Sequence, residues 1–187
     1  LSVKGATLKN NRSANYGGGI HSQVSLELDE TLMEGNYAGK YGGALSSAES
    51  NVSVADSTFK NNVAATSGGA IYTVDSTLTF DRTVMESNEA VNGGAIYNKS
   101  SVLSLTDSEI RGNSATSLGG AIYANDAQIS LDGILIEGNK GPNGGGLFSA
   151  ATSFSIENST LKGNVATASG GAIYAQRGEL KLNRVDR

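Results

Sequence analysis

The chain has no cysteine and no tryptophan, and only one proline among its 187 residues. Without cysteine it forms neither disulfides nor thiolate metal sites, so its stability has to come from packing and backbone hydrogen bonds. Lysine and arginine number 14 and aspartate and glutamate 18, which gives a net charge of −4. Because no basic cluster occurs, we expect no binding to nucleic acid.

Long apolar runs are also missing. No segment approaches the ~20 residues that a membrane-spanning helix needs, so we expect no direct membrane insertion by this segment. Branched aliphatic residues are nevertheless frequent enough to build a core, which argues against disorder. The length suits one domain, and residues 1–187 are predicted to form a single unit that is a piece of a longer repeat array.

Glycine is abundant and is placed at a regular interval. Gly-Gly pairs, each followed by a small residue and then by Ile or Leu, recur in steps of 25 or 26 residues. Internal repetition at such a period is typical of solenoid proteins. The seven pairs begin at Gly17, Gly42, Gly68, Gly93, Gly119, Gly144 and Gly170.

A second motif has the same period, namely an apolar residue, two variable residues and Asn. Eight residues before each of these asparagines stands the second member of an apolar-x-apolar pair, such as Leu78 and Phe80 before Asn88. Short alternating segments between polar turns indicate strands, and no segment has the period of a helix. We therefore predict an all-β fold, a right-handed parallel β-helix of about seven coils with three short strands per coil.

In stacked coils, equivalent positions of successive repeats form columns along the solenoid. The asparagine column is expected to form a ladder of side-chain amides at a buried turn, where loss of one amide would leave turn groups without partners. The predicted structural ladder consists of Asn11, Asn36, Asn62, Asn88, Asn113, Asn139 and Asn164.

A column of aromatic residues follows the Ile/Leu column and is expected to point outward. Stacked aromatic side chains on a sheet stabilise it. The same strip is also the candidate ligand-binding surface, able to stack on sugar rings or to dock a neighbouring molecule. Its members are Tyr72, Tyr97, Tyr123 and Tyr174.

The sequence supplies little for catalysis. His21 is the sole histidine, so no Ser/His/Asp arrangement can be assembled without it, and the acidic column that contains Asp81 and Asp132 is interrupted by other residues. We predict no catalytic residue, no metal site and no cofactor, and interpret the chain as not being an enzyme. A fragment of a β-helical polysaccharide-active enzyme stays open as an alternative, although no loop exceeds its repeat by more than one residue.

The combined motifs resemble the repeats of the polymorphic outer-membrane proteins of chlamydiae. Phe59-Lys60-Asn61-Asn62 with Gly68-Gly69-Ala70-Ile71 is the clearest copy, and the resemblance extends over nearly the whole chain. Members of that family are displayed on the cell surface or secreted, often as passengers of autotransporters, and act in adhesion. The resemblance therefore implies a structural or adhesive segment at the cell surface or outside the cell.

The expected partners are neighbouring repeats of the same chain or identical subunits, and a protein or glycan of a host or matrix. A self-assembling filament subunit is a further alternative, because strand edges at the ends of a solenoid can pair with other copies.

Overall fold

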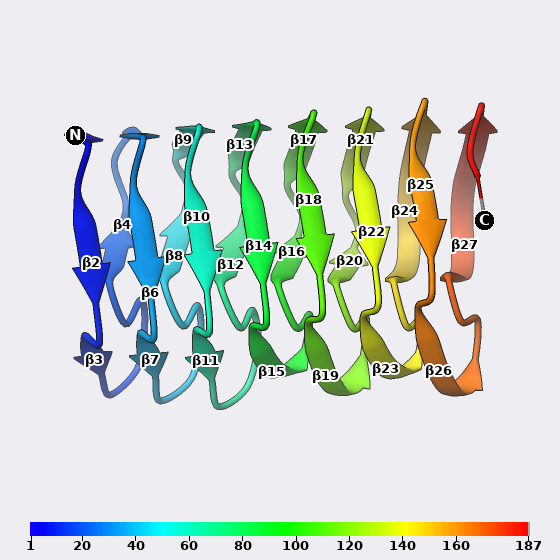
Figure 1. Ribbon diagram of the computed structural model, residues 1–187, viewed down its shortest axis with the longest axis horizontal. Coiled ribbons are helices and arrows are strands. Elements are labelled where there is room, and N and C mark those ends of the chain that lie inside the picture. The colour runs from blue at the N-terminus through cyan, green and yellow to red at the C-terminus, as the bar shows by residue number, and fades with distance from the viewer. Residues whose placement is uncertain (187) are drawn as a thin grey trace.

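The computed structural model describes residues 1–186 and contains strands, turns and no helix among them. All strand pairs are parallel, and each joins a residue to its equivalent 25 or 26 positions away, as in the pairing of Phe59 with Met33 and Met85. The chain is a parallel β-solenoid of about seven coils, as the repeat predicted, and its coils succeed one another along a single axis (Figure 1). We number the coils 1 to 7 by their ladder asparagines, Asn11 to Asn164.

Three sheets run the length of the solenoid. Sheet A has 13 strands, because most coils contribute two strands to it. We call the strand before sheet B the first branch and the strand after sheet C the second branch, and a turn joins the second branch of one coil to the first branch of the next. Toward the C-terminal end this turn is replaced by a continuous strand, β24 (Leu147–Glu157) from coil 6 into coil 7 and β27 (Ile173–Asn183) at the end of coil 7. The strands of the first branch are β1 (Ser2–Lys4), β5 (Leu26–Asp29), β9 (Asn51–Ala55), β13 (Thr77–Asp81), β17 (Val102–Thr106) and β21 (Gln128–Asp132). Those of the second branch are β4 (Ile20–Ser22), β8 (Leu45–Ala48), β12 (Ile71–Val74), β16 (Ile96–Lys99) and β20 (Ile122–Asn125).

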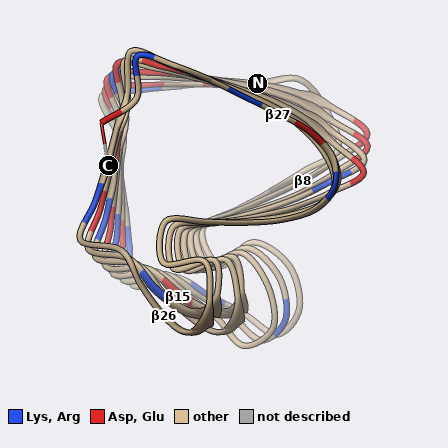
Figure 2. Ribbon diagram, turned by 90° about the vertical axis from the view of Figure 1, so that its right-hand side faces the viewer, with Lys and Arg blue, Asp and Glu red and all other residues tan. Residues whose placement is uncertain are grey.

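Sheets B and C have seven strands each and complete every coil. Sheet B consists of β2 (Thr7–Lys9), β6 (Leu32–Glu34), β10 (Thr58–Lys60), β14 (Val84–Glu86), β18 (Glu109–Arg111), β22 (Leu135–Glu137) and β25 (Thr160–Lys162). Sheet C consists of β3 (Arg12–Ser13), β7 (Tyr37–Ala38), β11 (Val63–Ala64), β15 (Glu89–Asn92), β19 (Ser114–Leu118), β23 (Lys140–Asn143) and β26 (Val165–Ser169). Viewed along the axis, the coils superimpose except in the lobe of sheet C, which lies beside the part of the coil that contains β8 (Figure 2).

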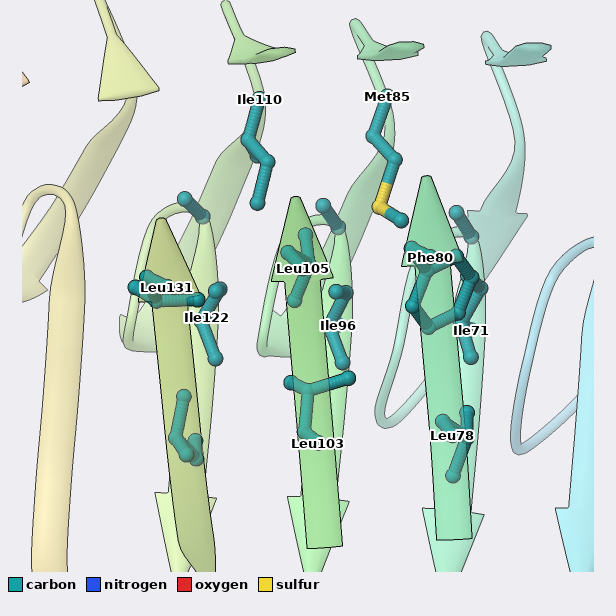
Figure 3. Packing of buried hydrophobic residues seen from close by; sticks show 14 of the residues in the cluster. Ile71, Leu78, Phe80, Met85, Ile96, Leu103, Leu105, Ile110, Ile122 and Leu131 are labelled. Carbon is teal, nitrogen blue, oxygen red and sulfur yellow. The ribbon is translucent and has the colours of Figure 1, made fainter. Parts of the chain in front are cut away.

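The core is a set of apolar columns inside the coil. Ile71, Ile96 and Ile122 stack in one column, and the apolar-x-apolar pairs and the residue three before each ladder asparagine fill the rest (Figure 3). All of these side chains in coils 2 to 6 are buried. Since each fully buried aliphatic side chain contributes about 1.5–3 kcal/mol, the columns supply the main drive for folding.

The Gly-Gly pair forms the corner between sheets C and A. The first glycine of each pair has a positive φ, for example 64° at Gly93. The second glycine is packed against the next coil, so that a Cβ atom on Gly94 would lie 2.1 Å from the carbonyl oxygen of Gly120. A side chain at Gly94 would therefore collide with backbone, which explains why both positions are glycine in every repeat.

Candidate functional site

The asparagine column lies at the turn between sheets B and C. The side-chain oxygen of Asn88 accepts bonds from both the backbone N–H and the side-chain amide of Asn62, at 2.9 and 3.0 Å. The amide of Asn88 in turn donates to Asn113 and to the carbonyl of Phe59. The same arrangement recurs from Asn11 to Asn164, and the five asparagines of coils 2 to 6 are buried. Each of these five therefore ties together two or three coils through groups that water does not reach.

A continuous stack of aromatic rings lies on the outer face of the second branch of sheet A. Ring centroids of neighbours are 4.6–5.4 Å apart along the whole stack, and from Tyr72 onward the interplanar angles are 4–17°. The stack, here called the aromatic ladder, consists of Tyr16, Tyr41, Tyr72, Tyr97, Tyr123, Phe148 and Tyr174. All four tyrosines of the predicted strip thus lie in one continuous surface feature.

Two members of the aromatic ladder come from a position that sequence analysis missed. Tyr16 and Tyr41 directly precede the Gly-Gly pair, whereas the later rings follow the Ile/Leu position. In coil 2 the position after Leu45 is Ser46, and the ring of Tyr41 contacts that of Tyr72 in its place, with centroids 4.6 Å apart. In coil 2 the residue before the glycine pair is Tyr41 and the residue after Leu45 is Ser46. In coil 3 the same two positions are Ser67 and Tyr72. This exchange of serine and tyrosine is the sequence signal for the second source of rings.

Stacking determines which parts of the rings a partner can reach. The faces of Tyr97 are covered by Tyr72 and Tyr123, at interplanar angles of 14° and 7°. A sugar that stacks on an aromatic side chain needs a free ring face. The half-buried aromatic ladder therefore offers ring edges and phenol hydroxyls to a partner, at a spacing of one coil.

The phenol hydroxyls of Tyr72, Tyr97 and Tyr123 stay protonated well above neutral pH. Burial, reinforced by repulsion from the neighbouring tyrosines, raises the pKa of Tyr97 to about 12. Burial also raises the pKa of Tyr72 and Tyr123 above the ordinary value. At physiological pH these three side chains are neutral hydrogen-bond donors as well as acceptors.

The remaining polar groups do not converge on one point. Asp81 pairs with Arg82, Asp132 accepts a hydrogen bond from Asn158, and the ring of His21 lies against Tyr16. Within residues 1–186, no three acidic or histidine side chains gather as metal ligands would. The larger hollows are shallow and lie along the first branch of sheet A and its preceding turn, where they are lined by hydroxyl side chains such as Ser53, Thr79 and Ser104.

The outer face of sheet B carries charges that sequence analysis missed. The residue directly after the apolar position of each sheet B strand is basic in coils 1, 3, 5 and 7 and acidic in coils 2, 4 and 6. This alternating charge column consists of Lys9, Glu34, Lys60, Glu86, Arg111, Glu137 and Lys162. Ion pairs join neighbours of the column at 3.0–3.7 Å, and Figure 2 shows the two colours alternating along that face.

The fold and its columns define a parallel β-helix repeat protein. Four segments, residues 5–23, 56–74, 107–125 and 158–176, match the model of the Chlamydia polymorphic membrane protein repeat. Each segment extends from the turn before a sheet B strand to the strand that follows the Gly-Gly pair. No curated protein and no solved structure matches the chain significantly.

Four stretches of the chain therefore match the repeat of the polymorphic membrane protein family, the family that its motifs resemble. That family indicates a surface-associated β-helix segment. Among residues 1–186, no helix offers an apolar stretch that could cross a bilayer.

Proposed function

We propose that the chain is a rigid structural segment of a surface-displayed or secreted protein, and that it adheres to a partner through its aromatic ladder. The observation that carries the proposal is the stacking of the seven coils in continuous parallel sheets, with coils that superimpose along the axis except in the lobe of sheet C (Figure 2). Hydrogen-bonded asparagines, stacked rings and core columns continue from coil to coil, so the segment resists bending along its length. Such a rod holds whatever lies at either end at a fixed separation.

The aromatic ladder supports the adhesive part of the proposal. It continues through all seven coils, and the hydroxyls of Tyr72, Tyr97 and Tyr123 repeat at the coil spacing of about 4.8 Å. Tyrosine combines an apolar ring with a hydrogen-bonding tip, and it is enriched at contact surfaces for that reason. A linear glycan or an extended peptide that runs parallel to the axis would meet one aromatic side chain per coil, a tyrosine in every coil but coil 6.

The test compares the chain with a variant in which Tyr72, Tyr97 and Tyr123 are replaced by Phe. Phe148 already occupies this column, so the Phe variant keeps the stack and loses only the hydroxyls. Binding to a glycan array and to cultured epithelial cells is measured for both. We expect binding to fall at least tenfold in the Phe variant and to be unchanged in a Ser53→Ala/Ser104→Ala control on the first branch of sheet A.

Equal binding by the Phe variant would overturn the aromatic ladder as the adhesive surface. Absence of binding by the unmodified chain to every glycan and cell type would overturn adhesion and leave the structural role alone.

A further inference from the structure

Most columns of the solenoid are the same in every coil, so they do not distinguish one neighbour from another. The ladder asparagine and both glycines of the pair are invariant, and the Ile/Leu column contains only these two residues of equal volume. A coil placed over the wrong neighbour would therefore keep its core and its asparagine bonds. Strand register is weakly specified where side-chain patterns are alike.

The outer face of sheet B is different, because it repeats every two coils. In the alternating charge column each of the five inner side chains, from Glu34 to Glu137, stands between two of opposite sign. A second outward position on the same strands is Thr or Glu in odd coils and Leu or Val in even coils, as in Thr58 beside Val84. An error that skips one coil would place two basic or two acidic side chains beside each other at the site of the error.

Hydrogen bonds at the corner between sheets A and B show the same two-coil period. The hydroxyl of Ser57 accepts a bond from the backbone N–H of Thr31 in the preceding coil, at 3.0 Å. Ser108 accepts from Thr83 in the same way, and the next odd coil repeats the bond through Ser159. In each case an odd coil supplies the acceptor and the preceding even coil supplies the donor.

The family match has this period as well. The matched segments begin at residues 5, 56, 107 and 158, and all belong to odd coils. We propose that the unit of assembly in this array is a pair of coils, 51 residues long, and that the alternating charge column disfavours stacking errors of one coil. Within a chain or between arrays, a basic coil is expected to accept only an acidic neighbour on either side.

The experiment forces a stacking error of one coil by deleting one coil from the chain. Deleting residues 129–153 removes coil 6, joins Gln128 to Phe154 at equivalent positions, and places Arg111 beside Lys162. Adding Lys162→Glu to the deletion restores the alternation in a chain of the same length, and Lys162→Gln removes the repulsion without creating an ion pair. Melting temperatures of the three chains are measured in low salt and in 1 M NaCl, the latter having a screening length of about 3 Å.

We expect the Lys162→Glu deletion chain to melt about 2–4 °C above the deletion chain in low salt, because one pair of like charges becomes a pair of opposite charges. The Lys162→Gln chain should fall between them, and the differences should vanish in 1 M NaCl. Deletion of residues 103–153, one whole pair of coils, should add no such salt dependence. Equal melting of the three chains in low salt would overturn the proposal.

Should the deletions fail to fold, the full chain gives a second test. Exchanging the charges at two positions, Lys60→Glu with Glu86→Lys, keeps the composition. It sets an acidic side chain beside Glu34 in coil 2 and a basic side chain beside Arg111 in coil 5. A melting temperature below that of the unmodified chain in low salt, with the gap closing in 1 M NaCl, supports the paired unit. An unchanged melting temperature contradicts it.

Discussion

The asparagine column and the aromatic ladder both extend through all seven coils, but they are built under different constraints. In every coil the ladder asparagine occupies the same sequence position, since its side chain has to reach one backbone N–H and one amide of fixed placement. The aromatic ladder switches its source between coils 2 and 3. Stacking requires only that a ring lies at the right height, and two positions satisfy it. Directional hydrogen bonds therefore require one residue type at one sequence position, whereas stacking requires only that an aromatic ring occupies a given place.

Breaking the asparagine column in its middle should have the largest effect. In Asn88→Ala the buried amide groups of Asn62 lose their acceptor and the carbonyl of Phe59 loses its donor. We expect the free energy of unfolding to fall by about 3 kcal/mol, measured by urea denaturation. Asn11→Ala is the control at the exposed first coil, where the loss should stay below about 1 kcal/mol. Equal losses at the two sites would show that the buried amide bonds do not carry the stability.

Breaking the aromatic ladder should have a smaller effect. Tyr97→Ala removes two stacked contacts, and double-mutant estimates for such pairs give a loss of about 2 kcal/mol in all. Tyr97→Phe should stay within about 0.5 kcal/mol of the unmodified chain, because the hydroxyl plays no part in stacking. The same urea denaturation checks both, and a Phe variant as unstable as the Ala variant would assign the stability to the hydroxyl.

The next prediction moves a tyrosine of the aromatic ladder from the position before the glycine pair to the position after the Ile/Leu residue. Tyr41→Ser opens a gap in the aromatic ladder, and Ser46→Tyr alone crowds a buried position. Together they give coil 2 the arrangement of coil 3, so we expect the double variant to recover most of the stability that Tyr41→Ser loses. A double-mutant cycle measures the coupling, expected at about 1 kcal/mol. Additive losses would mean that the position before the glycine pair cannot be exchanged for the later one.

The last prediction concerns alkaline pH. Burial favours the neutral phenol and raises the pKa of Tyr97 to about 12, above its ordinary value near 10. The folded state therefore keeps its full stability from this group below pH 10 and loses it as the pH rises from 10 to 12. Ultraviolet titration of tyrosinate, compared with the Tyr97→Phe variant, measures the group directly. A Tyr97 that ionises near pH 10 in the folded chain would contradict its burial.

The sequence sufficed to predict the repeat, the parallel solenoid and the family, because a 25- or 26-residue period with invariant Asn and Gly-Gly has few structural explanations. It also predicted which tyrosines lie outward. It did not predict Tyr16 and Tyr41 in the aromatic ladder, since columns were aligned on one position and side chains that meet from two positions escape such an alignment. The alternating charge column was missed because a period of one coil was sought.

The role predicted for the aromatic strip changes in one respect. Stacking on sugar rings requires free ring faces, and in the middle of the aromatic ladder those faces are covered by neighbouring rings. The ring faces are covered because neighbouring coils are close together, and the identity of a residue at one position does not reveal this distance. Contact through ring edges and hydroxyls stays as the proposal.

Amide hydrogen exchange at the turns between sheets B and C tests the central claim, that identical columns join every coil to the next. The account predicts strong and nearly equal protection of the backbone N–H groups of Asn36, Asn62, Asn88 and Asn113, each of which donates to the asparagine of the following coil. Rapid exchange at these amides, or protection confined to one or two coils, would contradict a continuous solenoid.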